Sequence, residues 1–407
     1  MIERCVAPSP ERFAREHWGR RPLHSPAAEL PRDFTDLLSP QAVDELVAER
    51  GVRTPFLRMA REGRLVDRAC FTRTGGFGAE MADQIDSSGV LAQFASGATI
   101  VLQGLHRLWP PIIAFVGGLA VELGHPVQTN AYITPPDNRG FDPHYDVHDV
   151  FVLQVSGRKH WLVHDPVHPD PLADQPWTDH RAAVEARAAE PAAIDAVLAP
   201  GDALYLPRGW IHSARSLGET SVHLTVGVSA FTQLDVVRAL LTALGDRAEL
   251  RASLPMGLDT ADPVALEPIV RDVAQTMGKL LHEQTEGIDR PDGVVASGSA
   301  SLAARFVDLT RPEPVRPLAT VDAIAALGPD TAVRVRAGLH PRVERRGDRT
   351  TLRLPTATLS LPVSCDDAVR AVMSGETLTP AALPGLDEHD ALVLIRRLLR
   401  EGVVVTA

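Results

Sequence analysis

The pattern of apolar and polar positions predicts strands in the first half of the chain and helices after it. Two segments, ATIVLQGL at 98–105 and VFVLQV at 150–155, are rich in apolar and β-branched residues and are predicted to be strands. From residue 231 onward the apolar positions recur at helical spacing, most clearly at 234–244 and 264–281. The chain is therefore expected to belong to the α+β class.

Helices are also predicted within the strand-rich part. The segments at 13–23, 39–50 and 110–123 have helical patterns, and the second begins with Ser39 as N-cap and Pro40 at the first helical position. We expect residues 1–98 to form a mixed cap that leads into an antiparallel barrel, and 110–123 to pack on that barrel.

The C-terminal segment combines short strands with helices. Strands are expected at 331–339, 349–355, 358–363 and 402–407, and helices at 366–373 and 390–400. This mixture is typical of a small winged-helix-like module. The chain is thus expected to have three parts, with boundaries at 1–230, 231–312 and 313–407.

Two segments far apart in the sequence carry a candidate metal site. His144 and Asp146 are separated by one residue, and His212 follows much later. In an extended chain, alternate side chains share a face, so His144 and Asp146 point the same way while Tyr145 points away. Two imidazoles and one carboxylate are the facial triad of non-haem Fe(II) proteins, which leaves metal positions open for a co-substrate and oxygen. The sequence therefore predicts an iron-dependent oxygenase.

Two neighbouring features compete with this assignment. His168-Pro169-Asp170 has the same spacing, but its proline would remove a hydrogen-bond donor from a central strand, so we expect a loop. His148 continues the alternation of His144 and Asp146. We interpret it as pocket lining, with a ligand role in place of His144 as the alternative.

Lys159 is one of two lysines among 41 basic residues, the other being Lys279. We expect Lys159 to continue the strand that carries the first two candidate ligands. Its odd offset from His144 would then turn it to the opposite face, unless a bulge or bend at Ser156-Gly157 re-aims it. A buried ammonium needs an anionic partner, which a dicarboxylate would provide. The alternative is a solvent-exposed lysine at a strand end.

Three long motifs carry a resemblance to a known family. They are VQTNAYITP (127–135), PHYDVHDVFVLQVSGRKHW (143–161) and GDALYLPRGWIHSA (201–214). In this order they resemble the JmjC-type cupin oxygenases, and among these the ribosomal oxygenases, which hydroxylate ribosomal proteins. The resemblance implies a double-stranded β-helix (cupin or jelly-roll) barrel, a helical dimerisation region and the winged-helix-like module.

The resemblance also implies roles for individual residues. His144, Asp146 and His212 match the iron ligands. Lys159 and Tyr132 match the residues that hold the distal carboxylate of 2-oxoglutarate, and Asn130 matches an asparagine of the co-substrate pocket. Lysine at position 159 is more similar to the histidyl-hydroxylase branch than to the arginyl-hydroxylase branch.

The family's chemistry uses Fe(II), 2-oxoglutarate and molecular oxygen to hydroxylate a protein side chain, here expected to belong to a ribosomal protein. Departures at Val147, His148 and the Ala-rich segment 166–200 lie on the substrate side, and that segment is expected to form a loop or short helix near the pocket mouth. The alternatives are a peptide or small-molecule tailoring hydroxylase, a protein demethylase, and a catalytically silent cupin scaffold.

Composition indicates the expected cellular location and the kind of partner. The three cysteines have no metal or redox spacing, no apolar run has the length of a membrane span, and the N-terminus lacks a signal-peptide core, which together favour the cytoplasm. The net charge of −11 argues against a general nucleic-acid binder but does not exclude a basic protein partner, which an acidic surface would attract.

Arginines are nevertheless concentrated near the C-terminus, and this leaves two interpretations open. A basic cluster on a winged helix indicates nucleic-acid contact, whereas arginines at strand edges also form ordinary solvated faces. The cluster consists of Arg334, Arg336, Arg342, Arg345, Arg346, Arg349 and Arg353.

Overall fold

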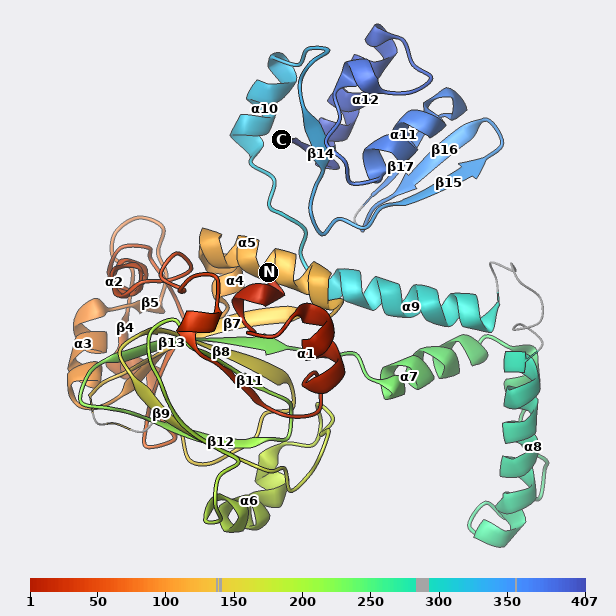
Figure 1. Ribbon diagram of the computed structural model, residues 1–407. Helices are drawn as coiled ribbons and strands as arrows, with labels where there is room; N and C mark the ends of the chain where they lie inside the picture. The colour runs from red at the N-terminus through yellow and green to blue at the C-terminus, as the bar shows by residue number, and fades with distance from the viewer. Residues whose placement is uncertain (137, 139–140, 283–292, 356) are drawn as a thin grey trace. The chain divides into compact units, whose positions relative to one another are not determined.

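The computed structural model describes residues 1–136, 138, 141–282, 293–355 and 357–407. The chain divides into two compact units. The first comprises 1–230 with 312–314, and the second comprises 231–311 with 315–407 (Figure 1). This division does not separate 231–312 from 313–407, so the three-part organisation stays a prediction.

An antiparallel sheet of eight strands forms the centre of the first unit, in the order β1-β11-β8-β13-β7-β6-β2-β3. Strand β13 forms long ladders with β8 on one side and with β7 on the other, so these three strands form the middle of the sheet. The strands are β1 (Leu23–Ser25), β2 (Leu57–Arg61), β3 (Arg64–Leu65), β6 (Thr99–Leu102), β7 (Val127–Thr134), β8 (Asp149–Ser156), β11 (Ala203–Leu206) and β13 (Ser221–Val228).

A second antiparallel sheet of three strands, in the order β10-β9-β12, lies across from the first. Its strands are β9 (Lys159–His164), β10 (Ile194–Leu198) and β12 (Ile211–Ser216). Side chains of β7, β8 and β13 share one cavity with side chains of β9 and β12, so the two sheets enclose a common space. The expected antiparallel α+β architecture is confirmed at this level.

The turn between β8 and β9 shows that one expectation about Lys159 was wrong. The lysine does not continue β8: the chain turns at Gly157 and starts a new strand in the smaller sheet. Gly157 has φ +64°, and a β-carbon there would lie 2.2 Å from the carbonyl oxygen of Thr220. A glycine is therefore required at this position, and the change of sheet re-aims Lys159.

Alternate side chains of strand β8 belong to two different parts of the core of the first unit. Phe151 and Leu153 belong to the large core shared with the helices, whereas Val150 and Val152 pack with residues of the smaller sheet. Because both faces are covered, nearly the whole strand is buried, as its continuous apolar run predicted.

Helices α1 (Pro10–Glu16) and α5 (Pro110–Leu123) cover the outer face of the large sheet (Figure 1). The helix predicted at 110–123 is confirmed, and so is the helix at 39–50, found as α2 (Pro40–Ala48) with Ser39 as its N-cap. The helix expected at 13–23 is wrong in its limits, because α1 begins at Pro10 under a Ser9 cap and ends at Glu16.

The other short elements of the first unit connect these layers. They are η1 (Ile2–Arg4), η2 (Ala27–Glu29), η3 (Arg68–Cys70), β4 (Thr72–Arg73), β5 (Gln84–Ile85), α3 (Ser87–Ala95), α4 (Leu105–Leu108), η4 (Trp177–His180) and α6 (Arg181–Ala188).

Three helices begin the second unit: α7 (Gln233–Leu244), α8 (Pro263–His282) and α9 (Val294–Leu309). The first two were predicted from their periodicity, and α9 was not. Asp235 closes a capping box at the start of α7 and binds Arg305 of α9, with Nη1 2.5 Å from Oδ1, so that pair holds the two helices together. By contrast, none of the described residues of α8 is buried.

The rest of the second unit is a small mixed module with its own core. Strands β15 (Arg342–Arg346), β16 (Arg349–Arg353) and β17 (Thr358–Pro362) form one sheet, and β14 (Val333–Val335) pairs with β18 (Val404–Thr406). Leu352 and Leu359 pack against side chains of the helices α11 (Asp366–Met373) and α12 (Glu388–Arg400). The remaining elements are η5 (Ala248–Leu250), α10 (Pro317–Ala325), η6 (Val363–Cys365) and η7 (Pro380–Ala382).

The helix predicted at 366–373 is found with these limits as α11, and the other predicted strands and helices of this module are found with shifted ends. Strand β15 and helix α10 were not expected. Within the described residues, no helix has both the length and the apolar character needed to cross a membrane. Cys5, Cys70 and Cys365 are all free thiols.

Candidate metal centre

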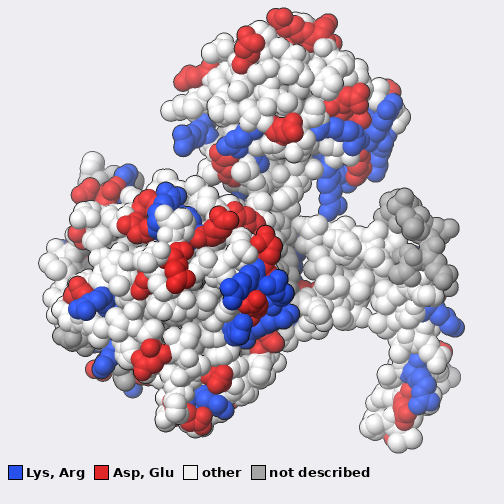
Figure 2. All heavy atoms as spheres, viewed as in Figure 1, with Lys and Arg blue, Asp and Glu red and all other residues white. Residues whose placement is uncertain are grey.

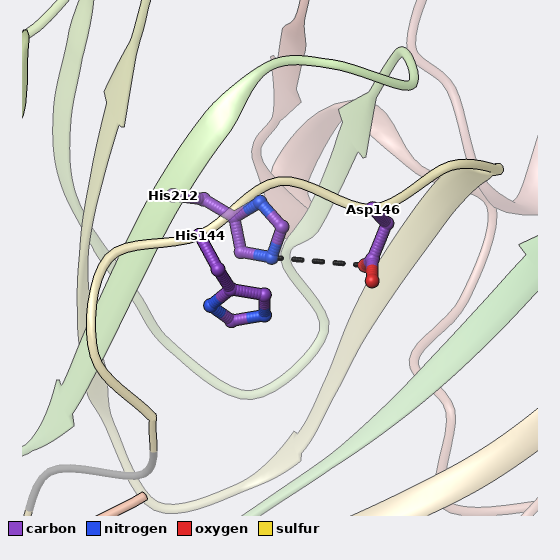
Figure 3. Close-up of side chains that lie close together, drawn as sticks. All are labelled: His144, Asp146 and His212. Carbon is purple, nitrogen blue, oxygen red and sulfur yellow. Dashed lines mark ion pairs between the residues drawn. The ribbon is translucent and has the colours of Figure 1, made fainter. Parts of the chain in front are cut away.

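His144, Asp146 and His212 come together at one end of the space between the sheets (Figure 3). One ligand atom from each lies within 4.8 Å of the other two. Nε2 of His212 is 3.8 Å from Oδ2 of Asp146, and the two imidazole centroids are 4.5 Å apart. Ligand atoms about 2 Å from one metal lie about 3 to 4 Å from each other, so these three donors are close enough to hold a single ion.

Hydrogen bonds to the backbone orient both imidazoles. Nδ1 of His144 lies 2.7 Å from the carbonyl oxygen of Asp142, and Nδ1 of His212 lies 3.1 Å from that of Trp210. Because a carbonyl can only accept, Nδ1 carries the proton in each ring. The lone pair of each neutral ring is therefore on Nε2, and this is the tautomer that a metal-binding histidine needs.

The backbone also joins the two segments that carry these side chains. His144 and His212 form an isolated antiparallel bridge, with N–H to oxygen distances of 3.2 and 2.8 Å, and Gly209 donates to the carbonyl of Asp146. His144 and Asp146 precede the first residue of β8, so they do not lie on the regular strand. The alternation nevertheless holds: Tyr145 points away, is buried, and donates its hydroxyl to the carbonyl of Gln175.

The protonation states suit a cation. Burial and the neighbouring His144 lower the pKa of His212 to about 4, so its ring is neutral at physiological pH. Burial alone would raise the pKa of Asp146, but the nearby His148, His212 and His144 lower it overall, so the carboxyl is ionised. Two neutral nitrogen donors and one carboxylate are the donor set of the facial triad, and the three residues thus fit a divalent metal such as Fe(II).

The competing histidines lie elsewhere. His148 packs over Gly227, where a β-carbon would approach its Nε2 to 2.9 Å, and it lines a neighbouring cavity. It is not part of the three-residue cluster found among the described residues. The loop expected at His168-Pro169-Asp170 is confirmed, and Asp170 pairs with Arg208 at 3.4 Å.

A cavity of about 270 Å³ extends from the three side chains between the two sheets. Lys159 lies in this cavity with only 3% of its surface exposed, and its Nζ donates to Oγ1 of Thr134 at 3.0 Å. The ammonium is 5.9 Å from the ring centroid of Trp161. Burial lowers the pKa of Lys159 to about 7, and no carboxylate within the described residues pairs with it. The exposed-lysine alternative is therefore wrong.

Other polar atoms around Lys159 are buried without a partner among the described residues. They include Nε1 of Trp161 and Nδ1 of His223. His223 stacks on Tyr132 with centroids 5.2 Å apart and rings nearly parallel, and burial together with the charge of Lys159 keeps its pKa well below the usual value. A buried cation beside unsatisfied polar atoms favours an anionic ligand with several acceptor oxygens.

Tyr132 and Asn130 lie on β7 with both side chains directed to the same face. Tyr132 lines the cavity of Lys159, whereas Asn130 lines the neighbouring cavity of about 400 Å³ and accepts the backbone N–H of Gly104 at 3.0 Å. Asp146 and Arg58 line both cavities, so the two spaces meet beside the candidate metal centre.

Sequence reasoning missed three groups of pocket residues. Arg58 comes from β2 in the N-terminal cap, where nothing in its surroundings marks an inward arginine. His223 lies on β13 between apolar neighbours, a pattern that marked a buried strand and not a site. Phe141 comes from a loop and Trp177 begins η4, and both rings lie about 6 Å from that of His144.

The segment 166–200 was expected to form a loop or short helix near the pocket mouth. It reaches the cavity through Trp177. Arg181 lies over the Trp177 ring at 4.5 Å, and Val184 of α6 is buried against Tyr145 and Ile211. The segment is thus anchored directly behind the residues that flank His144, Asp146 and His212. The loop or short helix expected in this segment is found as α6, and β10 is an additional strand.

With this geometry in place, comparison with known proteins is informative. Residues 119–236 match the JmjC domain family. This part of the chain is similar to JmjC domains. The chain is 31% identical to ribosomal oxygenase 1 of Gallus gallus over 267 residues, and 27% identical to the bifunctional lysine-specific demethylase and histidyl-hydroxylase NO66 of Aedes aegypti over 264 residues. Each match covers 62% of this chain, but only 41% and 39% of the relatives, so the chain aligns with about two fifths of their length.

Solved structures agree over a longer range. The chain is similar to Escherichia coli ribosomal oxygenase YcfD, with a TM-score of 0.55, 19% identity and 99% of both chains covered. A structure of YcfD in complex with cobalt and 2-oxoglutarate gives a TM-score of 0.53 at 18% identity, covering 98% of this chain and 99% of that chain. At this identity the likeness establishes the fold. The resemblance to JmjC-type ribosomal oxygenases, predicted from three motifs, is confirmed.

Proposed function

We propose that this protein is an Fe(II)- and 2-oxoglutarate-dependent oxygenase that hydroxylates a protein side chain. The observation that carries the proposal is the burial of Lys159, without a carboxylate partner among the described residues, in the same cavity as His144, Asp146 and His212. A chelating dicarboxylate could reach both the metal and the ammonium. A metal site and a buried ammonium in one cavity are expected where a co-substrate is held at both of its ends.

In this proposal His144, Asp146 and His212 hold Fe(II), which together with 2-oxoglutarate and oxygen supplies the oxidising chemistry when bound. The chain's own contribution at this end is orientation. The carbonyls of Asp142 and Trp210 fix both rings, so each offers Nε2 without rearrangement. Since the three residues occupy one side of the ion, the opposite positions stay available for ligands.

At the other end, Lys159 and Tyr132 hold the far carboxylate of 2-oxoglutarate. Thr134 keeps the Lys159 ammonium in place, and His223 and Trp161, each with an unpartnered ring nitrogen, line the same cavity. Val150, Val152 and Trp161 line the cavity between the two ends and limit access of water, which strengthens the Lys159–carboxylate attraction. Asn130 borders this pocket from the neighbouring cavity, with its carbonyl oxygen fixed by Gly104.

The proposed substrate is a ribosomal protein, with a histidyl or arginyl side chain as the hydroxylated residue. The names of the relatives, which include a ribosomal oxygenase and a histidyl-hydroxylase, support this class. The rings of Phe141 and Trp177, each about 6 Å from that of His144, would suit a planar side chain held by stacking. A smaller peptide substrate is the remaining enzymatic alternative.

Two assembly proposals accompany this function. The apolar positions of α7 and α8 are proposed to form a homodimer interface, because Val237, Leu241, Val264 and Val270 are each at least 46% exposed in the single chain. The C-terminal module is proposed to be winged-helix-like, on the basis of its helices packed against a three-stranded sheet. Three free cysteines support a cytoplasmic location.

The decisive experiment loads the purified protein with Fe(II) and 2-oxoglutarate without oxygen, and then measures succinate after oxygen is admitted. We expect succinate from the parent and from His148→Ala, and none from His212→Ala. A parent that forms no succinate would favour a non-catalytic scaffold. The substrate is then sought by mass spectrometry of ribosomal proteins from a strain lacking this protein, as the loss of one oxygen atom from one protein; methyl-lysine peptides test demethylation.

A further inference from the structure

The three-stranded sheet of the C-terminal module has one apolar and one polar face. Thr350, Leu352 and Leu359 point inward and are buried. The outward positions alternate with them along each strand, and five of these positions carry charge. They are Arg342, Glu344 and Arg346 on β15, Arg349, Thr351 and Arg353 on β16, and Thr358, Ser360 and Pro362 on β17. We call these nine residues the arginine face.

The register of this sheet places like charges directly opposite each other. Arg342 pairs with Arg353 and Arg346 pairs with Arg349 across β15 and β16. Like charges at opposed positions destabilise a ladder by up to about 1 kcal/mol for each pair. Glu344 lies between the two pairs and binds Arg346 at 3.1 Å and Arg353 at 3.2 Å. One carboxylate offsets four guanidinium groups only in part, so the face keeps an excess of positive charge.

Part of the face is held in position before any ligand arrives. Arg349 donates from Nε to Oγ of Ser360 and from Nη2 to its carbonyl oxygen, both at 2.9 Å. The Ser360 hydroxyl accepts this bond, so its proton can be donated to a ligand. Thr351 and Thr358 add hydroxyls between the arginines on the same face. The hydroxyls of Thr351 and Ser360 thus lie in the row between the two arginine pairs.

The charge of this region contrasts with that of the whole chain. Residues 331–365 contain seven arginines and two acidic residues, Glu344 and Asp348, in a protein of net charge −11. Basic side chains gather over the β15–β16 hairpin in Figure 2. A local excess of this kind attracts a polyanion even where the whole protein would repel one.

We propose that the arginine face binds the backbone of RNA. Outward side chains repeat about 7 Å apart along a strand and about 5 Å apart between strands, so the two arginine pairs lie about 14 Å apart with Glu344 and Thr351 between them. Guanidinium groups bind phosphate through paired hydrogen bonds. The interleaved hydroxyls can bond the ribose 2′-hydroxyl, which distinguishes RNA from DNA. An acidic peptide would use the charges but would leave the hydroxyl row without a role. This binding is independent of the oxygenase chemistry.

The test measures fluorescence anisotropy of a labelled single-stranded RNA against the full chain at several salt concentrations. A triple variant, Arg342→Gln with Arg346→Gln and Arg353→Gln, is expected to weaken binding about tenfold or more at low salt. The slope of log affinity against log salt should fall by about 2, at about 0.7 for each lost contact. Thermal unfolding should show little change in stability, because the loss of the two ion pairs of Glu344 is offset by the removal of the opposed like charges. Arg342→Gln alone should reduce the slope by about 0.7.

A matched control is available in the first unit, where Arg12, Arg15 and Arg21 surround Glu16. Replacing these three by glutamine removes the same charge from an equally exposed cluster and should leave RNA binding unchanged. Equal losses in both triple variants would reduce the effect to net charge and overturn the proposal. So would the absence of RNA binding at low salt, equal binding of DNA of the same sequence, or equal binding of a polyglutamate peptide. Succinate formation should be the same in all variants, which separates this test from that of the oxygenase.

Discussion

At the scale of single residues, the candidate metal centre depends on ring orientation as much as on residue type. His144, His148 and His212 all surround Asp146, yet only two of them donate Nδ1–H to a backbone carbonyl and converge with Asp146 on one point. His148 is instead packed over Gly227. The difference comes from the positions of two backbone carbonyl oxygens. These positions are set by the fold and cannot be recognised in the sequence.

This orientation gives a first prediction for the metal. His144→Ala, Asp146→Ala and His212→Ala should each abolish metal binding, because two donors cannot hold the ion with comparable affinity. His148→Ala and Asp170→Ala should keep it. Titration with Co(II), followed by its visible absorption, measures binding without requiring turnover. Loss of Co(II) binding in His148→Ala, together with its retention in His144→Ala, would exchange the two assignments.

Lys159 gives a second residue-scale prediction. Lys159→Ala should lower the affinity for 2-oxoglutarate at least about a hundredfold, or about 3 kcal/mol, because the far carboxylate would lose its cation in a buried pocket. Co(II) binding should be unchanged. The matched control is Lys279→Ala, which removes the chain's other lysine from an exposed helical position. Unchanged 2-oxoglutarate affinity in Lys159→Ala would place the co-substrate elsewhere.

The buried amine also predicts a pH dependence of stability. The pKa of Lys159 is about 7 in the folded protein and 10.5 in an unfolded chain, so between these values the unfolded chain binds the extra proton. The ligand-free protein should therefore gain stability as pH rises through this range, by at most about 1.4 kcal/mol per pH unit from this group. Lys159→Met should show a flatter thermal-midpoint profile than the parent. Affinity for 2-oxoglutarate should show the opposite trend and fall above pH 7, because its carboxylate needs the ammonium.

At the scale of elements, the turn between β8 and β9 determines whether Lys159 reaches the cavity. Gly157 combines a left-handed backbone with contact against Thr220, whereas Gly124, at the end of α5, has φ +67° and open space around it. Gly124→Ala should cost about 1 to 2 kcal/mol from backbone strain. Gly157→Ala should cost at least about 3 kcal/mol, because overpacking is added to the strain. Chemical denaturation measures both. Equal costs would mean that contact with Thr220 does not constrain the turn.

At the scale of the whole molecule, the helices of the second unit predict a dimer. Leu240 packs near Gly298 of α9 within the chain, whereas Val237 and Leu241 lie one turn apart on α7 and are about 46% and 47% exposed. Replacing Val237 and Leu241 by arginine should therefore dissociate a dimer without unfolding the chain. Light scattering should give about 88 kDa for the parent, twice the 43.9 kDa chain mass, and a monomer for the variant.

Leu240→Arg is the contrasting variant, because it would disturb the packing of α7 on α9 and lower the thermal midpoint. If the dimer also shapes the substrate cleft, the monomer should lose activity on a ribosomal protein while still turning over 2-oxoglutarate slowly. A parent that is monomeric and fully active would refute the dimer and favour a smaller peptide substrate.

The sequence by itself determined the elements whose signals are local. Helix α5 follows from its proline start and its apolar run, α2 from Ser39 and Pro40, and strand β8 from its β-branched run. The three motifs were also sufficient to predict the JmjC resemblance, because His144, Asp146 and His212 stand in long segments of specific composition. The roles assigned to these residues stay predictions that the experiments above address.

Only the tertiary structure decided what depends on distant partners. The chain changes sheets at Gly157, so strand alternation could not indicate the direction of Lys159. Arg58, His223 and Trp177 enter the cavity from three separate parts of the chain, and their neighbours in sequence do not distinguish them from ordinary surface or core residues. The opposed arginines of β15 and β16 become pairs only through the register of the hairpin. Local patterns specify which segments can bury a face, whereas the energy of burying a charge is set by residues that folding brings together from elsewhere.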